Sequence, residues 1–462
     1  MPQPLLLAQQ ACSFFLARLE AETVRLKGLT FPGHDIGPRK WINLVAGLIS
    51  SGRAFLDESR SETDPGTARR KLQEAEDIGE RAYKLLAEVS GTDATQIPHE
   101  IIAPFHSWIR DLKIDNTTFF RAAHLSNYEL WTVPEPKMRT KPSPTFSKAL
   151  ADIAWPVLIV AVPARAMDML PHFAVVAHEL GHAIHHLIKP DLKLAENERR
   201  ACEARIEARL QANGTPFGQE EQLRLTEITD NWIEEIKADA VGHILVGPAY
   251  FFALCGFLEL ALRTYGIAET HPPSQLRRQL LMQELASGSS SFSDVFLRRT
   301  QVALSDDLNS PNIPACPHGD DLFSELLDQY SVTEAAICTE LIPYIASLGP
   351  IVFAAARSHL QETCPDLIYT SDKLDYDLGD PLTMLSYLVP PIESNDGAAP
   401  KPLGLASILN IGWAALLTRL DQIPDKGGDP SKLDARRSDQ LHQLLLKAVE
   451  LSEASRLWSS PT

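Results

Sequence analysis

The stretch Val175-Val-Ala-His178-Glu179-Leu-Gly-His182-Ala-Ile-His185-His186 carries the strongest chemical signal in this 462-residue chain. His178 and His182 are four residues apart, about 40° around a helix, so both imidazoles project from one face. Two neutral imidazoles at that spacing suit a tetrahedral Zn²⁺, and Glu179 is placed to act on a water at the metal. The stretch therefore predicts a helix with two zinc ligands, against the alternative of a histidine-rich surface helix.

A catalytic zinc needs a third protein ligand and an open fourth position. A third histidine ten residues after His178 is excluded, because Ile188 stands there and His185 replaces the glycine of that pattern. The other solution is a carboxylate from a second helix. Glu235 and Asp239 are four residues apart and would share a helix face. We expect Glu235 to bind the metal and Asp239 to accept the second ring N–H of a ligand histidine.

The sequence around this acidic pair indicates that it turns inward. Glu234 would point about 100° away from Glu235 and is the less favoured ligand. The segment Ala240–Leu258 that follows is almost entirely apolar, and a buried carboxylate needs a partner such as a cation. Its length would just span a bilayer. We instead expect a pair of core helices that is broken at Gly247-Pro248.

Taken together, three motifs resemble those of the gluzincin metallopeptidases, and look most like the group of the CAAX prenyl endopeptidase and the HtpX-type bacterial endopeptidases. They are His-Glu-Leu-Gly-His at 178–182, Glu-x-x-Ala-Asp-x-x-Gly at 235–242 and Thr-His-Pro-Pro-x-x-x-Arg at 270–277. The resemblance implies a zincin-type catalytic core that holds Zn²⁺. It further implies that His271 is an oxyanion donor and that Arg277 holds the site or contacts the bound peptide.

The clearest strand signal is Val157–Val162, a β-branched apolar run between Pro156 and Pro163. This strand resembles the one that precedes the zinc helix in the gluzincin family. We expect the strand to offer an edge on which an extended peptide can pair. The resemblance covers roughly Pro156–Leu280. Family members usually have transmembrane helices, and we expect none here, since the apolar stretch Ala240–Leu258 is expected to form core helices.

Composition excludes several classes of protein. Lys and Arg number 43 against 60 Asp and Glu, the net charge is −17, and 44% of residues are apolar. These values exclude a disordered chain and a collagen-like repeat, and the acidic balance argues against nucleic acid as a partner. Six scattered cysteines without a Cys-x-x-Cys pair favour a reducing compartment. Residues 1–11 lack the features of a signal peptide, so we expect a cytoplasmic protein.

Helical periodicity dominates the rest of the chain. Apolar stripes predict helices at Thr67–Val89, Leu194–Leu210 and Ser438–Leu451, with Ser438 as a cap. The expected fold is mainly α (α+β): a zincin-type core with a small sheet and a zinc-binding helix, flanked by helical regions. The expected order is an N-terminal helical region, a linker or long loop, the metallopeptidase core and a C-terminal helical region, at 1–131, 132–150, 151–286 and 287–462.

The sequence thus predicts a zinc-dependent endopeptidase that acts on a protein or peptide substrate, with no membrane association and with helical flanks that a regulatory partner can engage. The alternative is a zincin-fold binding or regulatory module without catalytic turnover. A deformylase would need a cysteine ligand ahead of the zinc helix, and no cysteine lies between Cys12 and Cys202. That class of enzyme is set aside.

Overall fold

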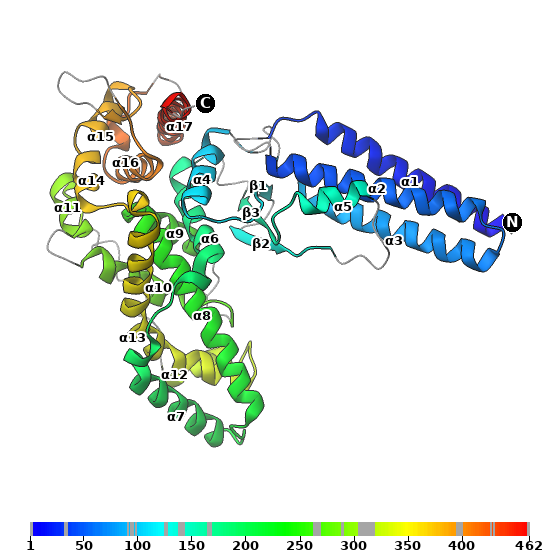
Figure 1. Ribbon diagram of the computed structural model, residues 1–462. Coiled ribbons are helices and arrows are strands. Elements are labelled where there is room, and N and C mark those ends of the chain that lie inside the picture. Colours follow the sequence, from blue (N-terminus) through cyan, green and yellow to red (C-terminus); the bar gives the residue numbers. More distant parts are fainter. Residues whose placement is uncertain are drawn as a thin grey trace. The chain divides into compact units, whose positions relative to one another are not determined.

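A computed structural model describes most of the chain. The chain divides into two compact units, Met1–Met167 and Asp168–Thr462 (Figure 1). The protein is mainly helical with a small sheet, as predicted. The described residues are 3–31, 36–89, 92, 97, 99–123, 128–136, 144–163, 169–261, 269–287, 291–303, 319–393, 401–425, 427 and 430–459.

The first unit combines long helices with a three-stranded sheet. Its elements are α1 (Gln3–Lys27), α2 (Ile36–Ser61), α3 (Pro65–Val89), α4 (His99–Asp111), β1 (Thr118–Ala123), β2 (Glu129–Val133), α5 (Pro144–Ala151) and β3 (Val157–Pro163). The predicted helix at Thr67–Val89 is confirmed by α3, whose stripe faces inward. The last seven residues of the predicted linker at 132–150 are helical, because α5 begins at Pro144, and residues 137–143 lie outside the described residues.

The sheet has the order β1-β3-β2, so β3 is its central strand. β1 pairs with β3 in parallel and β2 pairs with it antiparallel, and all of β3 is buried. The strand prediction at Val157–Val162 is confirmed. The expectation that this strand offers a free edge to a peptide is wrong, because both of its edges already bond neighbouring strands. Such a continuous β-branched run is typical of a central strand.

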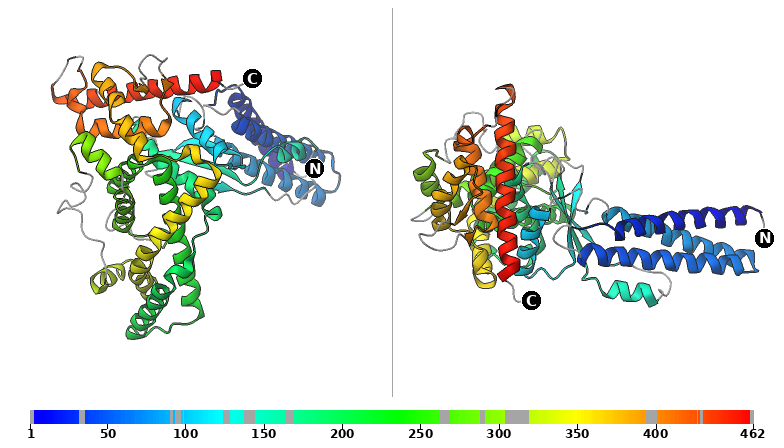
Figure 2. Two further views of the ribbon diagram at one scale, coloured as in Figure 1. Left: turned by 60° about the vertical axis from the view of Figure 1, so that its left-hand side comes forward. Right: turned by 90° about the horizontal axis from the view of Figure 1, so that it is seen from above.

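The second unit carries the metal-binding motifs. Its elements are η2 (Leu170–Val175), α6 (Val176–Ile184), η3 (His185–Leu187), η4 (Leu192–Ala195), α7 (Glu196–Ala212), α8 (Gln219–Val246), α9 (Pro248–Ala261), α10 (Ser274–Leu285), α11 (Phe292–Thr300), α12 (Gly319–Leu326), α13 (Val332–Thr363), η5 (Pro365–Leu367), α14 (Ser371–Asp377), α15 (Asp380–Met384), η6 (Leu385–Tyr387), β4 (Ile392–Glu393), β5 (Lys401–Pro402), α16 (Leu405–Thr418), η7 (Leu420–Gln422), η8 (Pro430–Lys432) and α17 (Leu433–Ser459). Near the C-terminus α16 packs along α17 (Figure 2).

The apolar stretch after the acidic pair forms two core helices, as predicted. α8 ends at Val246, Gly247 adopts φ +69°, and α9 begins at Pro248. Glycine suits this left-handed turn and proline suits a first helical position. By contrast, the prediction of Ser438 as a helix cap is wrong. α17 already begins at Leu433, with Asp434 in its first turn where a negative charge favours the helix dipole.

Among the described residues, α13 is the one helix long and apolar enough to cross a bilayer, and 72% of its most apolar window is buried within the protein. Core helices of soluble proteins meet the same criterion. α13 packs against α7 and α8, so its apolar face is used inside the second unit.

A buried carboxyl in α14 makes stability depend on pH. Asp377 is 1% exposed and accepts a hydrogen bond of 2.6 Å at Oδ2 from Tyr369 Oη. Burial raises the pKa of Asp377 to about 6, although the Tyr369 and Ser407 hydroxyls partly oppose the rise. The folded protein therefore binds this proton more tightly than the unfolded chain. Its free energy of unfolding falls as pH rises from about 4 to about 6, by on the order of 3 kcal/mol in all.

We expect Asp377→Asn to be more stable than the wild type at pH 7.5, by about 1–3 kcal/mol, because asparagine stays neutral while its carbonyl still accepts from Tyr369. The advantage should disappear near pH 4, where the wild-type carboxyl is protonated. Urea unfolding at both pH values measures the difference. An equal difference at pH 4 and pH 7.5 would contradict this account.

Candidate metal centre

The centre forms where α6 and α8 approach closely. A Cβ placed on Gly181 would lie 2.7 Å from Ala238 Cα and 2.9 Å from its carbonyl oxygen, so only glycine fits at this crossing. Gly181 lies between the two motif histidines in sequence, and Ala238 lies between the two motif acids. The two helices therefore approach closely between the residues that carry the predicted ligands, and this approach brings those side chains together.

Two imidazoles and one carboxylate converge at this crossing. His178 Nε2 lies 3.1 Å from His182 Nε2. Glu235 Oε1 lies 3.3 Å from His182 Nε2, and Glu235 Oε2 lies 3.4 Å from His178 Nε2. One ligand atom from each residue lies within 4.8 Å of the others. These three side chains form a group that can hold a metal ion, as the sequence predicted, and the group does not depend on Glu234.

A second carboxylate faces the outer nitrogen of each histidine. Asp239 Oδ1 lies 3.0 Å from His178 Nδ1, as the sequence predicted for Asp239. Glu234 Oε1 lies 3.1 Å from His182 Nδ1. A carboxylate at Nδ1 holds the ring proton there and leaves the Nε2 lone pair directed into the centre. Both rings are thus oriented as metal ligands, and sequence reasoning had assigned no role to Glu234.

The residues present fit a divalent cation. With the protons on Nδ1, the two Nε2 lone pairs face each other at 3.1 Å beside a carboxylate, an arrangement that repels without a positive charge between them. In addition, the buried Glu235 Oε2 has no hydrogen-bond donor among the described residues, although Arg277 Nη1 lies 3.2 Å away. A buried acceptor without a donor is costly. A cation bound between the two Nε2 atoms and Glu235 Oε2 would satisfy all three acceptors at once.

The electrostatics of the protein without metal also favour a positive charge at this centre. Burial alone lowers the pKa of His182, but hydrogen bonds that its ring donates to the Glu234 and Glu235 carboxylates outweigh burial and raise the pKa to about 10. For His178, burial likewise lowers the pKa, while Asp239 and Glu235 raise it further than burial lowers it. The surrounding carboxylates therefore draw positive charge into the centre, as protons or as a metal cation.

Glu179 lies beside His178 on α6 and is 5% exposed. Burial raises the pKa of its carboxyl, against the opposing effect of His178 and His182. A raised pKa brings a glutamate closer to neutral pH, where it can both accept and return a proton. The electrostatics of Glu179 therefore suit a carboxyl group that exchanges a proton.

The third motif segment lies against the same centre. His271 Nε2 lies 3.5 Å from Glu235 Oε1, and its Nδ1 lies 2.8 Å from Thr270 Oγ1. Its side chain is 45% exposed, so His271 reaches the metal group from the solvent side. The contacts agree with a role in binding substrate oxygen, which stays a prediction.

Arg277 is buried and bound to the acids of α8. Its Nε and Nη2 donate hydrogen bonds of 2.7 Å to Asp239 Oδ2 and Oδ1. Burial raises the pKa of Asp239, but this guanidinium outweighs burial and lowers it to about 2. Of the two roles implied for Arg277, holding the site or contacting a peptide, its contacts fit the first.

Tyr250 belongs to the site, and sequence reasoning missed it. Its Oη donates a 2.5 Å hydrogen bond to Asp239 Oδ1 and lies 3.2 Å from His178 Nδ1. A Cβ on Gly242 would lie 2.7 Å from the Tyr250 ring, so the last glycine of the second motif makes room for it. That glycine is the only signal in the sequence, and it does not say which side chain fills the space.

We expect Tyr250→Phe to weaken metal binding about tenfold, because the hydroxyl that fixes Asp239, and through it His178, is lost. Competition with a zinc chelator of known affinity measures the change. The matched control is Tyr83→Phe, since Tyr83 is 58% exposed on α3 in the first unit. Equal affinities for Tyr250→Phe and wild type would show that Arg277 alone holds Asp239.

Comparison of the chain with protein-family models, with curated proteins and with solved structures finds no match.

Proposed function

We propose that the protein is a zinc-dependent endopeptidase of the gluzincin type. The observation that carries the proposal is the convergence of His178, His182 and Glu235 next to the buried Glu179. Within this group the Oε2 atom of Glu235 accepts no hydrogen bond from the described residues. Two histidines and one glutamate are the ligand set of catalytic zinc in several peptidases, which leaves a fourth position for water or substrate. Three motifs from separate segments of the chain meet at this one place, which supports the resemblance.

Zinc suits the donor set better than the other common divalent cations. Imidazole nitrogen is a preferred donor for zinc, whereas magnesium and calcium favour sites made of oxygen ligands. When bound, zinc supplies a Lewis acid that makes water nucleophilic near neutral pH. Each ligand histidine also has the carboxylate partner on its outer nitrogen that is usual at zinc sites.

In the proposed reaction the chain's own residues move the proton. Glu179 takes a proton from the water while the water oxygen attacks the peptide carbonyl carbon. Glu179 then gives that proton to the leaving amine nitrogen. The C–O bond forms, the C–N bond breaks, and Glu179 returns to its starting state. His271 donates a hydrogen bond to the oxygen that becomes negative. Arg277 and Tyr250 keep Asp239, and so His178, in place.

The first test is metal content and its dependence on the ligands. We expect one zinc per purified chain by mass spectrometry of the metal, and almost none in His178→Ala or Glu235→Gln. His186→Ala is the matched control, because His186 is an exposed neighbour outside the metal group and should keep its zinc.

Cleavage is then measured with casein and with a library of internally quenched peptides. Zinc-dependent cleavage supports the proposal. A wild-type protein without zinc would overturn it. Stoichiometric zinc with no cleavage of any substrate would favour a binding or regulatory module.

A further inference from the structure

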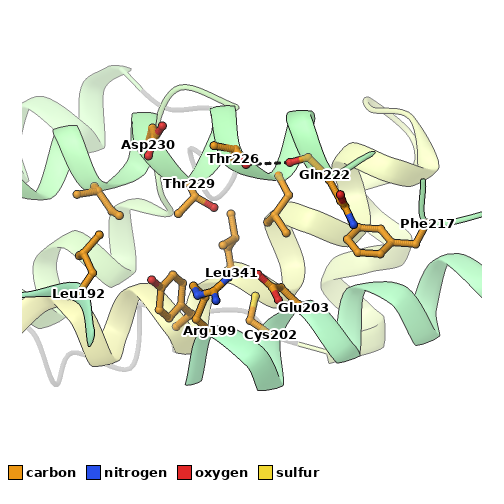
Figure 3. A pocket seen from close by; sticks show the side chains of 13 residues that line it. Leu192, Arg199, Cys202, Glu203, Phe217, Gln222, Thr226, Thr229, Asp230 and Leu341 are labelled. Carbon is orange, nitrogen blue, oxygen red and sulfur yellow. Dashed lines mark hydrogen bonds and ion pairs between the residues drawn. The ribbon is translucent and has the colours of Figure 1, made fainter. Parts of the chain in front are cut away.

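A cavity of about 480 Å³ lies in the second unit between α7, α8 and α13, and its volume is in the range of small-molecule sites. Figure 3 shows side chains from α7 and α8 facing each other across it, with Leu192 at one end and Phe217 at the other. Its floor consists of the buried Cys202, Ile233, Leu341 and Tyr344.

This cavity is distinct from the metal centre. On α8 its lining residues Thr226, Thr229, Asp230 and Ile233 lie between about 120° and 220° around the helix from Glu235. The cavity is therefore behind α8, while the metal group is on the face toward α6. A ligand bound in the cavity would not be held by the residues that bind the metal.

The charges of the lining favour a cation. Arg199 is already neutralised, because its Nε and Nη2 each lie 2.9 Å from Glu196 and its Nη1 bonds Glu203. Asp230 forms no ion pair within 4.0 Å among the residues that the structure describes, and Lys237, two turns further along α8, acts on it only at longer range. Asp230 is thus the one lining charge without a close partner.

The other residues that line the cavity indicate which kind of group the non-ionic part of the ligand would be. An apolar floor with the rings of Phe217 and Tyr344 suits an aliphatic or aromatic group, and an aromatic face also attracts a cation. Gln222 and Thr226 add a polar rim on the same side as Asp230. We propose that this cavity is a second ligand site, which binds an amphipathic amine with its ammonium group at Asp230 and its apolar body on the floor.

Dansylcadaverine, an aromatic probe with a primary amine, tests the site by fluorescence titration. Its matched anion is N-dansyl-6-aminohexanoate, with a similar body and a carboxylate. We expect the amine to bind about tenfold more tightly than the anion, as one charge-assisted hydrogen bond would give. The titration is repeated on protein treated with EDTA, so that its outcome does not depend on zinc or on peptidase activity.

Two variants localise the probe. Asp230→Asn, at an exposed rim position, should weaken amine binding about tenfold, and Thr229→Trp should abolish it by filling the cavity. Glu220→Gln and Leu223→Trp, on the same helix but outside the lining, should bind as wild type does. Equal binding of amine and anion, or unchanged binding by Asp230→Asn, would overturn the proposal.

Two sources of the ammonium group are separated by displacement of the probe. Octylamine represents a free amphipathic amine, and the peptide acetyl-Leu-Lys-Leu-amide represents a lysine side chain. Displacement by octylamine alone identifies a small-molecule site, and displacement by the peptide identifies a site for a lysine-bearing segment. Displacement by neither one would count against an amine ligand.

Discussion

Replacing Glu179 by glutamine is expected to remove peptide cleavage while zinc remains bound. Glutamine has nearly the shape of glutamate, but its amide cannot accept a proton from water. Loss of a general base typically lowers the rate by a hundredfold to ten-thousandfold. Glu179 is outside the group of metal ligands, so the metal content should stay at the wild-type value. Zinc analysis and the quenched-peptide assay on the same preparation measure both quantities.

The control for this variant is Glu220→Gln, which removes one acidic charge at an exposed position near the start of α8. It should leave both zinc content and cleavage unchanged. Full cleavage by Glu179→Gln would end the proposed mechanism, even if the metal assignment stood. Loss of zinc together with cleavage would instead show that Glu179 helps to build the centre.

Replacing Gly181 by alanine is expected to disrupt the metal centre through the backbone alone. Alanine raises helix propensity by up to about 1 kcal/mol, which on its own would stabilise α6. Here the new methyl group would lie 2.7 Å from Ala238 Cα, and a helix backbone cannot move aside as a side chain can. Overpacking typically costs about 1–3 kcal/mol, so the steric effect outweighs the gain in propensity.

We therefore expect Gly181→Ala to lower the melting temperature and to weaken zinc binding by tenfold or more, since separation of α6 from α8 draws Glu235 away from the imidazoles. The matched control is Gly256→Ala in α9, where the nearest atom would lie at an ordinary 3.5 Å. That variant should be as stable as the wild type or slightly more so. Unchanged zinc affinity in Gly181→Ala would show that the helix crossing tolerates a wider spacing.

Much of the metal centre could be predicted because its signals are local. The four-residue spacing of His178 and His182 fixes their common face wherever the segment is helical, and the same holds for Glu235 and Asp239. The apolar run after Asp239 indicated that this end of α8 is buried, and it is. These inferences needed only the geometry of single helices.

Other features depended on partners that no spacing reveals. Tyr250 follows a turn at Gly247, and the direction in which α9 leaves that turn decides that its hydroxyl returns to Asp239. Glu234 reaches His182 because the ring of that histidine presents Nδ1 toward it. Neither contact follows from the angle of a residue around its own helix.

The same limit explains the error about β3. A run of β-branched apolar residues indicates a buried strand, and β3 is buried. Whether such a strand is central or at an edge depends on which other strands pair with it. β1 and β2 both precede it in the chain and occupy its two sides.

Helical periodicity acts over a few neighbouring residues, so the sequence was enough to predict the helical character of the chain and the two pairs of metal-site residues. The order of the three motifs can also be read from the sequence directly. Three other features are absent from that local pattern: Glu234 also reaches His182, Arg277 and Tyr250 bind Asp239, and a cavity lies behind α8. These depend on which helices pack together and how closely. At Gly181 and Ala238 that distance is set by the absence of a single methyl group.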